Sequence, residues 1–173
     1  MADLHFVIGG AASGKSRIAM ERARALGGDQ VSFVATARPG DVELDERIAA
    51  HRRARPARWR TIDAGRELAA AVAAADPEHV LLIDSLTLWV AVALEAGDDP
   101  LRAWLAAAEV VRARVRPAVA VSDEVGLGVV PHTVYGRQFR EALGRLNQLV
   151  AAGAATVTLV VAGTALQLKA GAS

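Results

Sequence analysis

One glycine-rich segment constrains the fold of this chain more than any other feature of its sequence. The segment GGAASGKS, residues 9–16, follows the apolar run Leu4–Ile8 and leads into a helical stretch that begins near Lys15. It fits the pattern G-x-x-x-x-G-K-[ST], in which glycines let backbone N–H groups surround a phosphate and a helix N-terminus adds its positive dipole. We therefore expect Lys15 to reach the β- and γ-phosphates of a nucleoside triphosphate and Ser16 to bind Mg²⁺. The alternative is a glycine-rich turn that only joins a strand to a helix.

Short apolar runs alternate with helical stretches along the whole chain. We expect strands at Leu4–Ile8, Val31–Ala35, Val80–Asp84, Ala118–Ser122 and Val157–Ala162. We expect helices at roughly Lys15–Leu26, Val42–Ala54, Arg66–Ala75, Leu86–Glu95, Leu101–Val115 and Arg137–Ala152. The strand runs are apolar on both alternating faces, as in parallel strands covered by helices on both sides. The pattern predicts one α/β domain over residues 1–173, with a mainly parallel β-sheet flanked by helices.

The composition of the chain restricts its cellular location and the kinds of site and partner that it can have. Cysteine is absent, which excludes disulfides, thiolate metal sites and a thiol nucleophile, and the net charge is only +1. The N-terminus lacks the basic and long apolar regions of a secretory signal, so we expect a cytoplasmic protein. The stretch between Arg145 and Lys169 is uncharged and long enough to cross a bilayer. Its polar residues and its amphipathic first part nevertheless favour a helix of the folded domain over a membrane span.

Acidic residues stand at the ends of two expected strands. The run VLLID ends in Asp84, where a carboxylate at the end of a neighbouring strand would order the water shell of Mg²⁺. Asp84 could also be the N-cap of the following helix, and the two roles are compatible. The segment SDEVGLG carries Asp123 and Glu124 after the next apolar run, where loops of a parallel sheet line the ligand crevice. An ordinary strand-to-loop turn explains the same pattern, and both interpretations stay open.

Residues 51–60, HRRARPARWR, form an arginine island with five arginines and no acidic residue. Such a segment can fold over a transferring phosphate group and neutralise its charge. His51 stands beside Arg52 and Arg53, whose charges would keep its ring neutral and able to attack phosphorus, although a histidine beside arginines is more often a plain surface residue. Nucleic-acid binding is the weaker interpretation, because Trp59 is the only aromatic residue of the island.

The phosphate-binding loop leaves the reaction open, and other features of the chain narrow it. The guanine-reading string N-K-x-D of regulatory GTPases does not occur, and 173 residues leave little room for the further domains of a motor or recombination ATPase. A kinase for a small molecule fits the size best. A kinase with a single activity, in which His51 is dispensable, and a nucleotide-dependent switch module without small-molecule chemistry are the alternatives.

Five segments carry a resemblance that covers essentially the whole chain. They are GGAASGKS, FVATA, ERIAAHRRARPARWRT, LLIDSLTLWV and SDEVGLGVVP, and together they resemble the bifunctional adenosylcobinamide kinase/adenosylcobinamide-phosphate guanylyltransferase family of cobalamin biosynthesis. The patterns R-I-x-x-H-R-x-x-R-P-A-x-W-R-T and N/D-E-V-G-x-G-x-V-P are far more specific than the glycine-rich loop. The resemblance implies a P-loop, RecA-like fold, a homotrimer, a corrinoid substrate, and two reactions that use ATP or GTP.

The resemblance also implies roles for individual residues. It makes His51, which becomes covalently guanylylated, and Lys15 the catalytic residues, with Mg²⁺ held at Ser16 and Asp84. The nucleotide-binding residues are then Gly9, Gly10, Ala11, Ala12, Ser13, Gly14, Lys15, Ser16, Val34, Ala35, Thr36, Arg52, Arg53, Ala54, Arg55, Asp63 and Asp84. Asp63 stands where relatives carry an acid, which could accept hydrogen bonds from guanine, although an exposed loop aspartate fits equally well. The chain departs from some members in having Ala50-His51 in place of two histidines, and Asp84 in place of glutamate.

Overall fold

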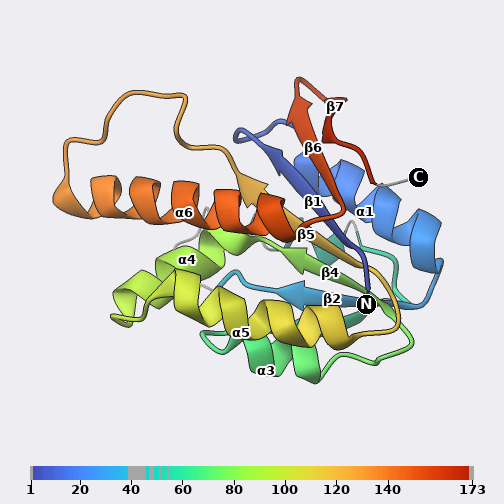
Figure 1. Cartoon of the computed structure of the whole chain (residues 1–173). Coiled ribbons are helices and arrows are strands. Elements are labelled where there is room, and N and C mark those ends of the chain that lie inside the picture. The colour runs from blue at the N-terminus through green and yellow to red at the C-terminus, as the bar shows by residue number, and fades with distance from the viewer. Residues whose placement is uncertain (1, 39–45, 47–48, 51, 54, 172–173) are drawn as a thin grey trace.

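Seven strands form one sheet in the computed structural model, which describes residues 2–38, 46, 49–50, 52–53 and 55–171. The strands are β1 (Leu4–Gly9), β2 (Val31–Ala35), β3 (Arg60–Asp63), β4 (Val80–Asp84), β5 (Ala118–Asp123), β6 (Thr156–Val161) and β7 (Thr164–Lys169). Their order is β3-β2-β4-β5-β1-β6-β7, and every neighbouring pair is parallel except the antiparallel hairpin of β6 and β7. The carboxyl ends of the six parallel strands therefore lie along one edge of the sheet (Figure 1).

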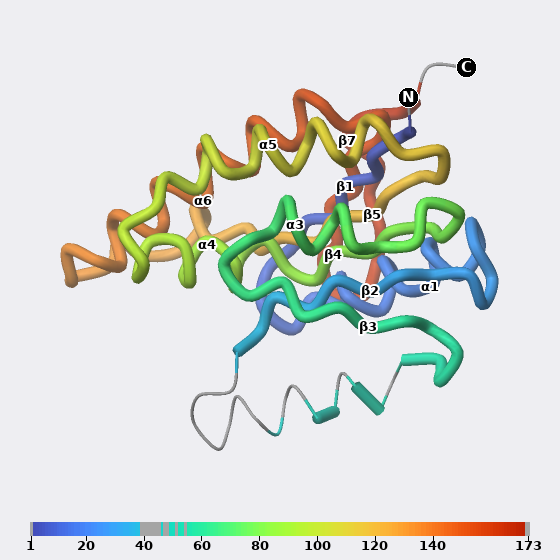
Figure 2. The backbone as a smooth tube through the Cα atoms, turned by 90° about the horizontal axis from the view of Figure 1, so that it is seen from below, coloured from blue at the N-terminus to red at the C-terminus, as the bar shows by residue number. Residues whose placement is uncertain are grey.

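Helices cover both faces of this sheet. They are α1 (Lys15–Gly27), α3 (Leu68–Ala73), α4 (Leu86–Glu95), α5 (Pro100–Ala113) and α6 (Val134–Gly153). Helix α1 lies on the opposite side of the sheet from α3, α4, α5 and α6, as Figure 1 shows. Figure 2 shows β3 running beside β2 at the outer edge of the sheet.

Local sequence signals define where α4, α5 and α6 begin. Ser85 caps α4 by accepting a hydrogen bond from the N–H of Leu88, and Asp99 caps α5, in which Pro100 takes the first position. Thr133 caps α6 in the same way by accepting from the N–H of Gly136. Each cap satisfies an N–H group that has no partner inside its helix.

Two buried clusters fill the space between the sheet and its helices. The larger one packs Phe6, Leu81 and Ile83 of the sheet against helices α3 to α6, and it includes Trp89 and Trp104. The smaller one packs the other face of the sheet against α1. Because the central strands are buried on both faces, their continuous apolar runs predicted a parallel sheet correctly.

The structure confirms the five expected strands and corrects several other expectations. Strands β3 and β7 were not expected, the helix expected at Arg66–Ala75 is shortened to Leu68–Ala73, and α6 begins three residues before Arg137. The helix expected at Val42–Ala54 lies largely outside the described residues. Within this range the structure describes residues 46, 49–50 and 52–53, and these are helical. The uncharged stretch before Lys169 is divided among α6, β6 and β7. In the described part of the chain, no helix combines the length and hydropathy needed to span a membrane.

Candidate active site

A cavity of about 800 Å³ opens along the edge of the sheet where β1, β2, β4 and β5 end. Cationic side chains from Lys15, Arg17, Arg52 and Arg55 line it together with the carboxylates of Asp84, Asp123 and Glu124. The remaining lining residues are Ala11, Ala12, Ser13, Gly14, Ser16, Met20, Ala35, Ala37, Ala50, Ser85, Leu88 and Val125. The volume lies within the range of small-molecule and cofactor sites in proteins.

The loop between β1 and α1 forms the floor of this cavity. Gly14 has a φ of 91°, a conformation that glycine adopts without the strain of a Cβ, and it begins α1 without a side-chain cap. A Cβ on Gly9 would lie 2.5 Å from the carbonyl oxygen of Val160 on the neighbouring strand β6. Gly9 therefore packs under the loop, while the segment from Ala11 to Ser16 faces the cavity. Uncapped N–H groups at a helix N-terminus bind phosphate well, so the geometry supports the phosphate-binding interpretation of this segment over a plain turn.

Lys15 makes an ion pair that the sequence did not predict. Its Nζ atom lies 2.5 Å from Oδ1 of Asp123 and donates a hydrogen bond to the carbonyl oxygen of Gly10 at 3.2 Å. Asp123 ends β5, the strand directly beside β1. The sequence left two interpretations of the segment SDEVGLG open, a segment that lines the ligand crevice and an ordinary turn. The structure supports the first, because Asp123 and Glu124 both line the cavity.

Asp84 lies one strand farther from the loop than expected. Strand β4 pairs with β5 and not with β1, so β5 separates Asp84 from the strand that carries the loop. The alternative role of Asp84 as N-cap of α4 is wrong, since Ser85 occupies that position. Asp84 lines the cavity, and so does Ser16.

The hydroxyl of Ser16 and the carboxylate of Asp84 form a donor set that suits Mg²⁺. Both offer oxygen atoms, which Mg²⁺ prefers, and this ion usually keeps several waters and substrate phosphates among its ligands. The described residues contain no group of three or more histidine, cysteine, aspartate or glutamate side chains placed to hold a metal on their own. Two oxygen donors from the protein would leave the remaining positions around Mg²⁺ for water and phosphate oxygens.

The end of β2 and the residue that follows it, Thr36, support the wall of the cavity. Thr36 is 1% exposed, and its hydroxyl both donates to the carbonyl oxygen of Ser85 at 2.7 Å and accepts from the N–H of Ser85 at 2.8 Å. Val34 is fully buried in the larger core cluster. Of the three residues expected here, only Ala35 lines the cavity, while Val34 and Thr36 support its wall.

The arginine island contributes two of its described arginines to the cavity. Arg52 and Arg55 line it, and the guanidinium of Arg55 lies 3.5 Å from the centre of the Phe33 ring. Burial lowers the pKa of Arg55, and the nearby carboxylate of Asp84 opposes this shift. Arg53 is exposed and does not line the cavity, and His51 and Ala54 lie outside the described residues.

The structure also gives the positions of Asp63 and Trp59, two residues that follow the described arginines Arg52 and Arg55 in the chain. Asp63 ends β3 and is not in a loop, and its carboxylate lies 4.0 Å from the guanidinium of Arg52 at an exposed position outside the cavity lining. Trp59 is 6% exposed and donates from Nε1 to the carbonyl oxygen of Gly28 at 3.1 Å. The aromatic ring of the arginine island is therefore part of the core and is unavailable for stacking on a nucleic-acid base.

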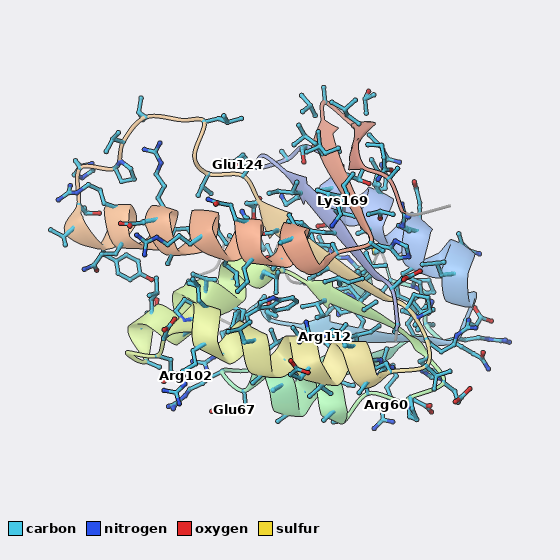
Figure 3. All side chains as sticks on the ribbon, in the orientation of Figure 1. Arg60, Glu67, Arg102, Arg112, Glu124 and Lys169 are labelled. Atoms are coloured by element: carbon cyan, nitrogen blue, oxygen red, sulfur yellow. The ribbon has the colours of Figure 1, made fainter. Side chains whose placement is uncertain are left out.

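Several residues that the sequence did not indicate line the cavity, because the fold brings separate elements together there. Arg17, Met20 and Leu88 line the cavity although they carried no local signal. Asp123 was expected as one residue of a segment that could line the crevice, but its contact with Lys15 was not. Arg17 follows the loop motif directly and also donates to the carbonyl oxygen of Gly163 in the β6–β7 turn at 3.2 Å. Arg60, although part of the arginine island, begins β3 and lies at the opposite end of the sheet from Glu124 (Figure 3).

Fold and site together define a P-loop nucleotide-binding α/β protein. Solved structures agree with this class: an ATPase from the type III secretion system of pathogenic bacteria has a TM-score of 0.62 at 11% identity, with 96% of this chain and 58% of that chain covered. The flagellar accessory protein FlaH from Methanocaldococcus jannaschii has a TM-score of 0.53 at 12% identity, with 98% and 79% covered. At these identities the similarity establishes the fold alone.

Comparison with sequence relatives identifies the family of the chain, which the solved structures do not. Residues 5–168 match the family described as cobinamide kinase / cobinamide phosphate guanyltransferase. The bifunctional adenosylcobalamin biosynthesis protein CobP of Pseudomonas aeruginosa is 43% identical, with 98% of both chains covered. The corresponding protein CobU of Salmonella typhimurium is 38% identical, with 94% of this chain and 98% of that protein covered. The chain belongs to the cobinamide kinase / cobinamide phosphate guanyltransferase family.

Proposed function

We propose that the chain phosphorylates adenosylcobinamide with ATP or GTP and then transfers GMP from GTP to the product, giving adenosylcobinamide-GDP. The observation that carries this proposal is that one cavity is lined by the P-loop residues Lys15 and Ser16, by Asp84 and by the described arginines Arg52 and Arg55. Family membership supports the pair of reactions, and the cavity offers the phosphate-binding groups that both of them need.

In the first reaction, the hydroxyl group of the aminopropanol arm of adenosylcobinamide attacks the γ-phosphorus of the triphosphate. The bond to the bridging oxygen breaks, the nucleoside diphosphate leaves, and the hydroxyl proton passes to the solvent or to a carboxylate. Lys15 holds the β- and γ-phosphate oxygens, and the guanidinium groups of Arg52 and Arg55 balance the charge. Bound at Ser16 and Asp84, Mg²⁺ would neutralise phosphate oxygens and help to orient them.

In the second reaction, a neutral imidazole nitrogen of His51 attacks the α-phosphorus of GTP. A P–N bond forms, the bond to the β-phosphate oxygen breaks, and pyrophosphate leaves. A phosphate oxygen of adenosylcobinamide phosphate then attacks the same phosphorus, the P–N bond breaks, and the electron pair returns to the imidazole. The direct reaction would require one anionic phosphate to attack another. A covalent intermediate replaces it by two easier steps.

We propose that the chain forms a homotrimer in the cytoplasm, the assembly that the family resemblance implies. Leu127, Val129 and Val130 are 89%, 93% and 68% exposed in the connection between β5 and α6, and burial of such side chains between subunits would stabilise an assembly. Both reactions consume nucleoside triphosphates, which the cytoplasm supplies. Light scattering coupled to size exclusion should give three times the mass of the chain, and a monomer at micromolar concentration would contradict the trimer.

Incubation with GTP labelled at the α-phosphate, followed by denaturing electrophoresis, tests the proposed function. A guanylyltransferase retains the label covalently, whereas a kinase with a single activity phosphorylates the corrinoid and leaves the protein unlabelled. A nucleotide-dependent switch would give neither result. GTP labelled at the γ-phosphate is the matched control, because that label leaves with pyrophosphate.

A further inference from the structure

Polar side chains of the neighbouring helices α4 and α6 hold the carboxyl end of β5 by hydrogen bonds. The backbone N–H of Asp123 donates to Oγ1 of Thr87 at 2.7 Å. The backbone carbonyl of Asp123 accepts a hydrogen bond from Nδ2 of Asn147 at 3.0 Å. Ser122 donates from Oγ to Oδ1 of Asn147 at 2.7 Å, which fixes the orientation of the carboxamide. Both backbone polar groups of Asp123 therefore have side-chain partners on different helices.

Asn147 interrupts an otherwise apolar stripe of α6. The buried residues of this helix are Leu143, Leu146, Asn147 and Val150, and Asn147 is 7% exposed. An apolar residue would fill the position at lower desolvation cost, because a buried amide is stable only when its hydrogen bonds are made. Packing of α6 does not explain the carboxamide, whereas its two hydrogen bonds to β5 do.

The residue held in this way contacts the P-loop lysine. The side chains of Lys15 and Asp123 are 12% and 21% exposed, so their ion pair is only partly screened by water. The backbone N–H of Glu124 also donates to the carbonyl oxygen of Gly9 at 3.0 Å, which joins the end of β5 to the start of the loop. A shift of the Asp123 backbone would therefore move the carboxylate that faces Lys15.

We propose that Thr87 and Asn147 are positioning residues for the two transfer reactions, and that they act through Asp123 on Lys15. The inference deepens the proposed function, since it concerns the same cavity. Asp123 restrains the ammonium group of Lys15 at the mouth of the loop, and the two helix side chains fix where that carboxylate stands. Phosphoryl transfer depends on the placement of charged groups, so a loosened lysine lowers the rate of the chemical step.

Lysine NMR offers a direct readout, because Lys15 and Lys169 are the only lysines of the chain. Lysine labelled at the ε-carbon should give two signals, and Lys169→Arg assigns them. Lys169 lies on β7 and donates to the carbonyl oxygens of Ala151 and Ala152 at the end of α6, so its signal is an internal control (Figure 3). Asp123→Ala should shift the Lys15 signal, and Thr87→Val should shift it in the same direction.

Kinetics supply the second readout through a double-mutant cycle. Thr87→Val keeps the shape of the side chain and removes the hydroxyl acceptor, whereas Thr87→Ser keeps the hydroxyl. Thr87→Val should lower kcat of both reactions about tenfold with little change in the triphosphate KM, and Thr87→Ser should restore it to within about twofold. In the Asp123→Ala background, Thr87→Val should have almost no further effect, because its route to Lys15 is already cut.

The outcomes separate this inference from the proposed function. The lysine signals do not depend on corrinoid turnover, so a wild-type chain without either activity contradicts the proposed function while the signals still decide the positioning role. An unshifted Lys15 signal in Thr87→Val would overturn the inference. So would a loss of kcat on Thr87→Val that is equally large in the wild-type and in the Asp123→Ala background. Should Thr87→Val fail to fold, Asn147→Leu is carried through the same two measurements and decides it.

Discussion

The Nζ atom of Lys15 lies 2.5 Å from Oδ1 of Asp123, so the lysine of the P-loop has a carboxylate partner at the end of the neighbouring strand. A bound triphosphate must share this lysine with Asp123 or take it over. The relationship follows from the order of the strands, since β5 is the parallel neighbour of β1 and ends beside the loop. It ties the acidic end of β5 to the phosphate-binding loop.

Replacing Lys15 by Ala should lower both transfer reactions by at least about a hundredfold, because a cation that stabilises the transferring phosphate is lost. Kinase turnover and guanylyl transfer are measured with purified protein under saturating nucleotide. Lys169→Ala removes the other lysine of the chain, on β7, and serves as the matched control. Kinase turnover near the wild-type rate in Lys15→Ala would show that the loop does not hold the transferred phosphate.

Replacing Gly9 by Ala should destabilise the fold by about 1–3 kcal/mol, the usual cost of forcing extra volume into a packed site. The new Cβ would lie 2.5 Å from the carbonyl oxygen of Val160, so β1 and β6 must separate. Gly10→Ala is the matched control for stability, since a Cβ there meets no atom within 4 Å. Equal midpoints of urea unfolding for the two variants would contradict the close approach of these strands.

The fold was predictable where burial leaves a local pattern. The central strands are covered on both faces, so each appears as a continuous apolar run in the sequence. Strand β3, with the sequence RTID, is largely exposed at one edge, and β7 is exposed along its whole length at the other. Edge strands need no continuous apolar run, and for that reason neither was expected.

The site was predictable only in part. The P-loop is contiguous in sequence, and its pattern alone indicated Lys15 and Ser16. The contact of Lys15 with Asp123 depends instead on β5 lying between β1 and β4, a long-range arrangement that no local spacing records. The same arrangement explains why Asp84, expected on the adjacent strand, lies one strand farther away.

Stability should depend on pH through His5, a buried residue of β1. Burial lowers the pKa of His5 from its ordinary value of 6.5, and the nearby Arg22 guanidinium lowers it further, with Asp3 opposing. The unfolded chain therefore takes up the proton more readily, and the free energy of unfolding should fall as the pH decreases below about 6.5. His5→Gln should flatten this dependence in urea titrations between about pH 5 and about pH 8. A steeper pH dependence in His5→Gln would contradict the assignment.

The arginine island should bind nucleotide phosphates and not nucleic acid. Its only aromatic ring, that of Trp59, is buried in the core, so no platform for base stacking remains. Filter binding with single-stranded DNA and RNA at low salt should show weak retention. Tight retention that falls steeply with salt would indicate that the arginines track a nucleic-acid backbone instead.

The chemistry of the label retained from GTP tests the central claim most directly. If His51 is the nucleophile, the bond to GMP is a phosphoramidate, so the label from α-labelled GTP should survive alkali and be lost in acid. His51→Ala should abolish labelling and guanylyl transfer while kinase turnover persists, because γ-phosphoryl transfer relies on the P-loop and Mg²⁺. Retained labelling in His51→Ala, or loss of both activities in a variant with an intact circular dichroism spectrum, would contradict the proposed division of roles.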